Sequence, residues 1–258
     1  MLRPRIIPCL LVQKKGLVKT INFSNPKYVG DPINAVKIFN EKEVDELVVL
    51  DIDATVNNVE PDYTMINNLA TECRMPFCYG GGVKTVEQAK RIIKLGVEKV
   101  AISSSATENP KLVSLMAEQL GSQSVVVVMD VKKNPWSGKY ELWTYNGKRN
   151  TGKDPVEHAQ ELEQLGVGEV TVNSIDNDGV MKGYDFLLVD KIRRSISVPM
   201  TILGGAGSLK DIEDLINKYG IIGAAAGSLF VFKGVYRAVL INYPSKSEKD
   251  AIMGNYGV

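Results

Sequence analysis

Short apolar runs rich in Val and Ile alternate along the whole chain with stretches whose apolar residues recur at helical spacing. Residues 85–95 show the helical pattern, with Val86, Ala89 and Ile92 on one face and Gly96 following where a left-handed cap is expected. This alternation predicts βα units and a parallel sheet. The predicted strands are residues 5–12, 46–51, 76–80, 99–102, 124–130, 169–174, 200–203 and 222–226.

Eight βα units in a chain of 258 residues predict an α/β fold of the (β/α)8 TIM-barrel type. Another helix is expected to open at residues 107–110, with Asn109 as its cap and Pro110 in its first position. No linker or low-complexity stretch divides the sequence. We therefore expect one barrel domain over residues 1–258, with half-barrels at about 1–122 and 123–240 and a C-terminal tail at 241–258.

An internal repeat supports the barrel. A glycine-rich turn at residues 79–83 leads through a helical pattern to Ser104, and a second turn at 203–207 leads in the same way to Ser228. The two stretches align without a gap, which predicts a duplicated half-barrel. The strands upstream form another pair, in which Asp130 of the second copy stands against Leu11 of the first.

Two long insertions follow predicted strands. Residues 13–30 contain a short hairpin pattern at 17–23, and residues 132–151 contain an alternating segment at 139–145 followed by Asn146-Gly147. Loops that follow strands lie on the C-terminal face of a barrel, where active sites are built. Long loops at that position are typical of functional segments.

The glycine turns suggest two phosphate sites, because glycine lets backbone N–H groups approach an anion closely. Two related turns on opposite sides of one barrel predict a long substrate with a phosphate at each end, although each turn alone could be a tight βα connection. The first site would consist of Gly81, Gly82 and Ser104, and the second of Gly205, Gly207, Gly227 and Ser228, with Asp178 and Gly179 beside it.

Composition narrows the class of protein. The chain is 44% hydrophobic and 24% charged with a net charge of +1, which gives no reason to expect nucleic-acid or membrane binding. Without a membrane-span or signal-peptide pattern, a cytoplasmic protein is expected. Cys9, Cys73 and Cys78 form no disulfide or metal framework, and Cys9 is expected to be a buried thiol. The single histidine, His158, is expected to be structural or on the surface. We predict no metal and no cofactor.

The sequence resembles the cyclase subunit of imidazole glycerol phosphate synthase over nearly its whole length. The motifs that carry the resemblance include Arg5-Ile6-Ile7-Pro8-Cys9-Leu10, Gly30-Asp31-Pro32, Gly80-Gly81-Gly82, Ser174-Ile175-Asp176-Asn177-Asp178-Gly179 and Gly204-Gly205-Ala206-Gly207. The resemblance implies a half-barrel repeat that receives ammonia from a glutaminase subunit of the HisH type on its N-terminal face. It further implies that a pair of aspartates closes an imidazole ring on the opposite face.

Four charged residues stand at or near the starts of predicted strands: Arg5, Glu46, Lys99 and Glu169. They match the family's ring of ion pairs at the ammonia entrance, so the resemblance implies an ammonia gate. The alternative is a set of four solvated rim residues. The surface near Glu98 and Glu169 is the expected glutaminase interface.

The predicted catalytic face departs from the family. The family has an essential aspartate where this chain has Leu11, whereas the second carboxylate, Asp130, is present, as is Lys19. Leucine cannot exchange a proton, so a two-carboxylate cyclisation loses one participant. Further pocket positions that differ from the usual residues are Ser103, Asn173 and Leu203.

The sequence therefore favours a barrel that keeps the ammonia path and has a different acceptor. It resembles paralogues of bacterial surface-polysaccharide pathways, in which ammonia passes to an ATP-dependent sugar amidotransferase on the C-terminal face. Asp51, Asp130 and Asp176 would then guide ammonia outward, and the glycine turns would bind a phosphorylated molecule or be inherited structure. The alternatives are the cyclase itself, a related sugar-phosphate isomerase and a scaffold without transport.

Overall fold

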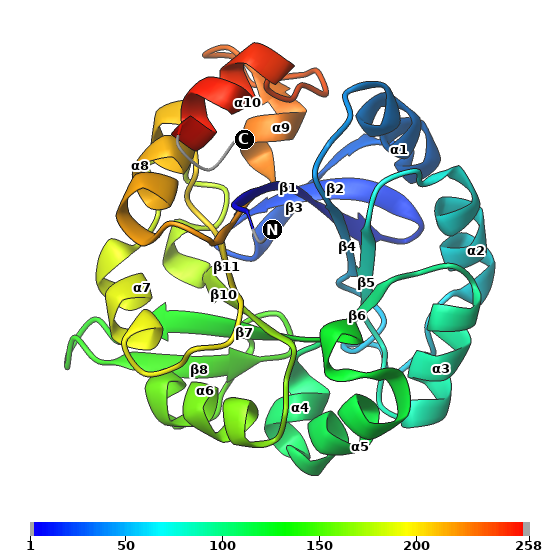
Figure 1. Cartoon of the computed structure of the whole chain (residues 1–258), viewed down its shortest axis with the longest axis vertical. Helices are drawn as coiled ribbons and strands as arrows, with labels where there is room; N and C mark the ends of the chain where they lie inside the picture. Colours follow the sequence, from blue (N-terminus) through cyan, green and yellow to red (C-terminus); the bar gives the residue numbers. More distant parts are fainter. Residues whose placement is uncertain (1–2, 255–258) are drawn as a thin grey trace.

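The computed structural model describes residues 3–254 and has a closed parallel barrel at its centre (Figure 1). The barrel strands are β1 (Arg5–Gln13), β4 (Leu47–Asp51), β5 (Phe77–Gly80), β6 (Lys99–Ile102), β7 (Val125–Lys133), β10 (Glu169–Ser174), β11 (Met200–Leu203) and β12 (Gly223–Ala226). Each strand pairs in parallel with the next, and the pairings β7–β10 and β12–β1 close the ring. This confirms the predicted (β/α)8 fold.

Helices surround the barrel as an outer ring (Figure 1). They are α1 (Pro32–Glu41), α2 (Tyr63–Glu72), α3 (Val86–Lys94), α4 (Ser104–Glu108), α5 (Lys111–Leu120), α6 (Pro155–Gln164), α7 (Phe186–Arg193), α8 (Leu209–Tyr219), α9 (Ser228–Val231) and α10 (Lys246–Met253), with the 3-10 turns η1 (Ser122–Ser124) and η2 (Ile175–Asn177). None of the helices within residues 3–254 is long and apolar enough to cross a bilayer.

Alternation along the strands divides the apolar residues into two cores. Ile6, Leu10 and Val12 of β1 face outward and pack in the large core between strands and helices. Ile7 and Cys9 face the barrel axis and belong to a small inner cluster. Successive side chains of a strand point to opposite faces, so the same rule places every second residue of each barrel strand inside.

The predicted elements occur with small changes at their ends. β7 extends beyond the predicted residue 130 to Lys133 because its last residues pair with an added antiparallel strand. Helix α3 is capped by Thr85, and Gly96 has a φ of +100°, in the left-handed region predicted from the sequence. Helix α5 begins at Lys111, one residue later than predicted, with Pro110 already at helical dihedral angles.

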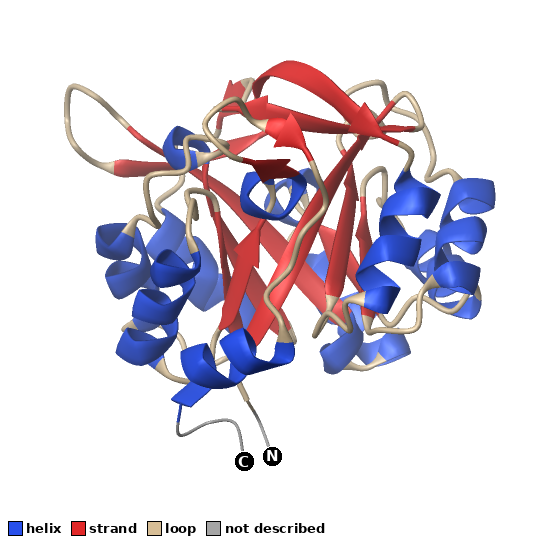
Figure 2. Cartoon of the chain, turned by 90° about the horizontal axis from the view of Figure 1, so that it is seen from above, coloured by secondary structure: helices blue, strands red, loops and turns tan. Residues whose placement is uncertain are grey.

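Both predicted hairpins are present and larger than expected. The first consists of β2 (Gly16–Ile21) and β3 (Ser24–Gly30), and it turns at Asn22 and Phe23, which both have positive φ. The second adds β8 (Tyr140–Thr144) and β9 (Arg149–Asn150) to β7. Figure 2 shows both hairpins at the end of the barrel to which the strand arrows point.

The C-terminal segment replaces a simple last βα unit. After α9, a small hairpin of β13 (Phe232–Lys233) and β14 (Ala238–Val239) precedes α10, whose Ile252 and Met253 are buried. The hydroxyl of Tyr243 donates a hydrogen bond of 2.8 Å to the carbonyl of Ile6, and its ring lies 5.3 Å from that of Phe230. Tyr243 thus ties this segment to the first barrel strand. Residues 255–258 of the predicted tail lie outside the described residues.

Tyr243→Phe should lower the free energy of unfolding by roughly 0.5–1.5 kcal/mol, because the buried Ile6 carbonyl loses a hydrogen-bond donor while the ring is kept. Tyr243→Ala should cost more, about 3–5 kcal/mol, since it also leaves a cavity. Urea unfolding followed by circular dichroism measures both. The matched control is Tyr28→Phe at an exposed ring, and an equal loss in the control would contradict the prediction.

Candidate functional site

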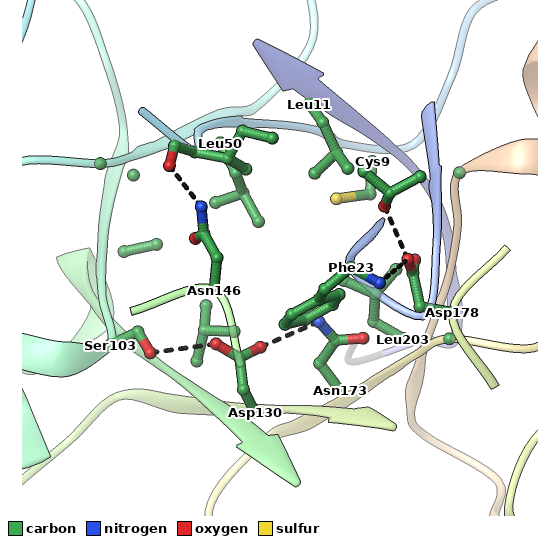
Figure 3. Close-up of a pocket in the computed structure, with 18 of the residues that line it drawn as sticks. Cys9, Leu11, Phe23, Leu50, Ser103, Asp130, Asn146, Asn173, Asp178 and Leu203 are labelled. Atoms are coloured by element: carbon green, nitrogen blue, oxygen red, sulfur yellow. Dashed lines mark hydrogen bonds between the residues drawn. The ribbon is translucent and has the colours of Figure 1, made fainter. Parts of the chain in front are cut away.

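A pocket opens where the barrel strands end, on the same face as the hairpins (Figure 3). Its volume is about 140 Å³. Side chains from opposite sides of the barrel meet there, among them Leu11 of β1, Asp130 of β7 and Leu203 of β11. The pocket thus lies where the topology of a barrel places catalytic groups.

Asp130 is the carboxylate at the inner end of this pocket. Asn173 Nδ2 donates to Asp130 Oδ1 over 3.0 Å, and Ser103 Oγ donates to Asp130 Oδ2 over 3.4 Å (Figure 3). Burial raises the pKa of Asp130 to about 7, against the lowering effect of these two hydrogen bonds. A carboxyl group with such a pKa can either give or take a proton near neutral pH.

The wall opposite Asp130 is apolar. Leu11 lies beside Leu50 in the register between β1 and β4. Leu203 of β11 lines the side of the pocket between Leu11 and Asp130, in register with Asn173. Position 11, where the resemblance implies an aspartate, therefore supplies no proton donor or acceptor. Phe23 reaches into the pocket from the turn of the β2–β3 hairpin (Figure 3).

Two other carboxylates line the pocket, and both are engaged by loops. Asp51 accepts hydrogen bonds from the backbone N–H groups of Asp53 and Ala54, at 2.9 and 3.1 Å. Asp178 accepts from Thr20 Oγ1 at 2.7 Å and from the N–H of Phe23 at 3.3 Å. Burial raises the pKa of Asp51 and of Asp178. These two carboxylates hold loop conformations, whereas the hydrogen-bond partners of Asp130 are pocket side chains.

Asp176 does not lie in this pocket, although the sequence suggested it. It is exposed on η2, and its carboxylate accepts a 2.8 Å hydrogen bond from the N–H of Lys133. The 3-10 turn directs Asp178, two residues further on, toward the pocket and leaves Asp176 outside. Its position thus supports a role in holding the β7–β8 hairpin and none in guiding ammonia.

Lys19 is buried and reaches from β2 to the pocket. Its Nζ donates a 2.6 Å hydrogen bond to the carbonyl of Cys9, and burial lowers the pKa of Lys19. A Cβ at Gly227 would lie 2.5 Å from the Lys19 ammonium, so a side chain at this position would displace the end of Lys19. The lysine therefore lies directly beside the second predicted phosphate site.

Both predicted phosphate sites line the pocket, and they differ in how many of their groups already form hydrogen bonds within the protein. In the first, Gly82 N–H donates to Thr55 Oγ1 at 3.2 Å, and Ser104 Oγ accepts from the N–H of Tyr145 at 3.1 Å. In the second, Gly205, Gly227 and Ser228 line the pocket with Gly179, while Gly207 lies outside it and donates to Asp211. A Cβ at Gly205 would lie 2.1 Å from the carbonyl of Gly183, which explains this glycine.

The sequence did not point to several pocket residues that come from the added hairpins and from the loop after β4. Thr20, Phe23, Thr55 and Asn146 all line it. Asn146 Nδ2 donates to the carbonyl of Ile52 at 2.6 Å and so fastens the β8–β9 turn to the loop after β4. The Asn146-Gly147 turn signal identified the bend but not the contact.

The four predicted gate residues meet at the opposite end of the barrel. Lys99 Nζ contacts Glu46 at 2.8 Å and Glu169 at 2.9 Å. Arg5 donates to both glutamates as well, at 2.8 Å to Glu169 Oε1, and Thr201 donates to Glu169. Acids and bases thus alternate in a closed ring. Burial raises the pKa of Glu169, but Arg5 and Lys99 outweigh it and bring the pKa down to about 2.

A small space of about 20 Å³, called the inner space below, lies between the charged ring of these four residues and the pocket. The carboxylate residues Glu46 and Glu169 bound it at one end. The residues that it shares with the pocket lining are Cys9, Leu50, Ala101, Val128 and Leu203. A space of about 10–15 Å³ suffices for one water molecule, so a molecule of that size fits inside.

The remaining titratable candidates lie away from the site or are inert. His158 is buried in α6 with Nδ1 3.1 Å from Glu161 Oε2, which fits a structural role. Cys9 is buried, and burial raises the pKa of its thiol to about 11. Within residues 3–254, no group of three or more His, Cys, Asp and Glu side chains is arranged to hold a metal ion.

A family model and individual relatives agree on the family to which this chain is similar. Residues 5–237 match the model of the histidine biosynthesis protein family. The chain is 58% identical to the Vibrio vulnificus protein named "Putative imidazole glycerol phosphate synthase subunit hisF3", over 96% of each chain. It is 41% identical to the imidazole glycerol phosphate synthase subunit HisF of Streptococcus sanguinis, over 89% of this chain and 91% of the relative. The chain therefore belongs to the histidine biosynthesis protein family, as a HisF-like subunit of the imidazole glycerol phosphate synthase type.

Proposed function

We propose that this chain is the barrel subunit of a glutamine-dependent complex and conducts ammonia from a HisH-like glutaminase to an acceptor. The observation that carries the proposal is the alignment of three features along the barrel axis. The charged ring lies at the N-terminal end, the small apolar space follows it, and the pocket opens beyond. The glutaminase would dock on the N-terminal face around Glu98 and the ring, as the resemblance implies.

The inner space favours neutral ammonia over ammonium. Its walls between the ring and the pocket include Val48, Cys78 and Ala225, which offer a cation no compensating charge. Moving an ion from water into such surroundings costs several kcal/mol, whereas a small neutral molecule avoids most of this cost. Both basic residues contact both glutamates, but Lys99 is the ring member best suited to move aside, because its single ammonium sits on a flexible stem, whereas the planar guanidinium of Arg5 offers a separate nitrogen to each glutamate.

The acceptor in this proposal is a nucleotide-linked sugar of surface-polysaccharide biosynthesis, amidinated by an ATP-dependent partner enzyme on the C-terminal face. Support comes from Leu11 and Leu50 on the wall opposite Asp130, where the second carboxylate of the cyclase reaction is missing from β1. On this reading the pocket passes ammonia onward and does not close a ring itself.

The alternative is the authentic cyclase of histidine biosynthesis. It is favoured by Asp130, whose pKa of about 7 suits proton exchange, and by the two glycine-rich turns at opposite sides of the pocket. In that case Asp130 acts without a second carboxylate on β1.

A direct assay distinguishes the two readings. With ammonia and the phosphoribosyl-formimino substrate of imidazole glycerol phosphate synthase, the unaltered protein should form product more slowly than its Leu11→Asp variant. The expected deficit is about 10²–10⁴-fold, the usual contribution of one general acid or base. Asp176→Asn is the matched control, since that acid lies outside the pocket. A normal cyclase rate in the unaltered protein, with little gain from Leu11→Asp, would refute the proposal that the acceptor is a sugar.

Replacing Lys99 by Ala should uncouple the two ends of the barrel. In the complex with glutaminase and acceptor, product formed from glutamine should fall about tenfold, the effect of a penalty of about 1.4 kcal/mol, because the ring no longer encloses the entrance. Product formed from added ammonium chloride should stay unchanged. Lys94→Ala on the exposed face of α3 serves as the control. Equal losses with glutamine and with ammonium chloride would argue against conduction.

The raised pKa of Asp130 predicts a pH-dependent stability. The folded protein, with a pKa of about 7 against the ordinary 3.8, binds one proton more than the unfolded chain between these values. The free energy of unfolding attributable to Asp130 therefore decreases as pH rises across this interval, by at most about 1.4 kcal/mol per pH unit. Asp130→Asn should remove this slope. Urea unfolding at pH 5, 6, 7 and 8 tests it, and parallel curves for both proteins would refute the assignment.

A further inference from the structure

Three hairpins on the face where the pocket opens carry a large excess of positive charge. They lie within residues 13–30, 132–151 and 232–240 and follow β1, β7 and, after the short helix α9, β12. Together these segments hold eleven Lys and Arg residues and a single acid, Glu141, whereas the whole chain holds 31 basic and 30 acidic residues. Glu141 accepts hydrogen bonds from two asparagines of its own segment. The hairpins are therefore strongly basic on a protein that is nearly neutral.

The same hairpins present exposed aromatic side chains. Tyr28 is 67% exposed, and Trp136 and Tyr236 are each 96% exposed, each on a different hairpin. These are the large aromatic side chains most open to solvent within residues 3–254. Asn134 Oδ1 accepts a 3.0 Å hydrogen bond from the N–H of Trp136, so the turn that holds this indole is fixed. Aromatic rings exposed on fixed turns are typical of residues that anchor protein–protein interfaces.

An open groove of about 660 Å³ lies beside the β13–β14 hairpin. Lys233 and Arg237 line it, and none of its lining residues, which all fall within residues 3–254, is acidic. Arg237 Nη2 donates a 2.9 Å hydrogen bond to the carbonyl of Gly179, which belongs to the pocket lining, so the groove borders the rim of the pocket. The apolar residues of the groove are Val180, Met181, Leu229, Phe232 and Val235.

Phe232 brings cations of two hairpins together. Lys27 Nζ lies 5.5 Å and Arg237 Cζ lies 5.0 Å from the centre of its ring. Within the described part of the chain, no ion pair joins Lys27, Lys233 or Arg237 to an acid. Like charges held near one another repel, so the approach of an acidic group lowers the electrostatic energy of this surface.

The arrangement favours a protein over a small molecule or a membrane as the occupant. A nucleotide in the groove would leave Trp136 and Tyr236 uncovered, because neither lines it. A flat anionic bilayer would also meet acids, since the exposed residues Glu60 and Asp176 lie in loops of the same face. A folded partner can complement such a pattern of charges and receive protruding aromatic rings at the same time.

We propose that the three hairpins are the docking surface for the acceptor enzyme, which places an acidic segment in the groove and receives Tyr236 and Trp136 in pockets of its own. This inference rests on the proposed function, in which an ATP-dependent enzyme takes up ammonia at the C-terminal face, and it adds the residues that hold that enzyme. β1 and β12 are neighbours in the ring of strands, and β7 lies opposite them. An enzyme held by all three hairpins therefore covers the mouth of the pocket, so that ammonia reaches it without passing through bulk water.

The test measures binding of the purified acceptor enzyme to this chain in its complex with the glutaminase, by surface plasmon resonance. The double variant Tyr236→Ser/Lys233→Glu should bind about tenfold or more weakly, the usual effect of removing an aromatic anchor. Trp136→Ser should weaken binding as well. Raising sodium chloride from about 0.05 M to about 0.5 M should weaken binding of the unaltered protein, because salt screens the attraction between exposed charges. Unchanged affinity in both variants would overturn the proposal.

The matched control is the double variant Leu187→Ser/Lys191→Glu, which changes an exposed apolar and an exposed basic residue on α7. It should bind like the unaltered protein, and circular dichroism should show that every variant is folded. Failure of the unaltered protein to bind the acceptor enzyme would refute the proposed function, whereas full binding by the hairpin variants would refute the docking surface alone. Vesicles of phosphatidylethanolamine and phosphatidylglycerol test the membrane. Vesicle binding lost in the hairpin variants, with binding of the acceptor enzyme kept, would overturn the proposal.

Discussion

A closed eight-stranded barrel allows only every second residue of each strand to face its axis, and the space at that axis is limited. In this protein the constraint arranges the inward residues in successive levels. Charged side chains from β1, β6, β10 and the residue before β4 meet at one end, small apolar residues such as Ala101 and Ala225 follow, and Ser103, Asp130 and Asn173 face the pocket. A barrel interior is ordinarily filled by branched side chains. The smaller residues here leave the space on which the proposed passage depends.

The charged ring at the N-terminal end carries a free-energy cost, because its ionised groups are removed from water. Two acids and two bases alternate, so each buried carboxylate is neutralised by Arg5 and by Lys99. Replacing a buried ion pair by well-packed apolar residues is often neutral or stabilising, so stability alone does not explain such a ring. A polar closure that can open without exposing an apolar core gives a functional explanation and fits the proposed entry of ammonia.

At the C-terminal end of the barrel, the three carboxylates that line the pocket differ in their hydrogen-bond partners. Asp51 and Asp178 bind backbone and hydroxyl groups of loops, and Asp130 binds the side chains of Asn173 and Ser103. Asp130 lies opposite Leu11, and its pKa, raised to about 7 by burial, suits proton exchange near neutral pH. The hairpins after β1 and β7 complete the pocket through Phe23 and Asn146, so the site is assembled from both half-barrels.

The sequence alone determined the barrel, its repeat and the positions of the strands, because strand alternation and helical spacing are local periodicities. The same periodicities placed Arg5, Glu46, Lys99 and Glu169 near strand starts, and the family resemblance implied that they form a ring. Only the tertiary structure decided which polar groups remain available for a ligand. Hydrogen bonds between residues far apart in the chain decide which groups these are. Thr20 and Phe23 donate to Asp178, and the N–H of Lys133 donates to Asp176, which lies outside the pocket. The N–H of Tyr145 donates to the hydroxyl of Ser104. Such contacts join residues far apart in the chain, and hydrophobic periodicity carries no information about them.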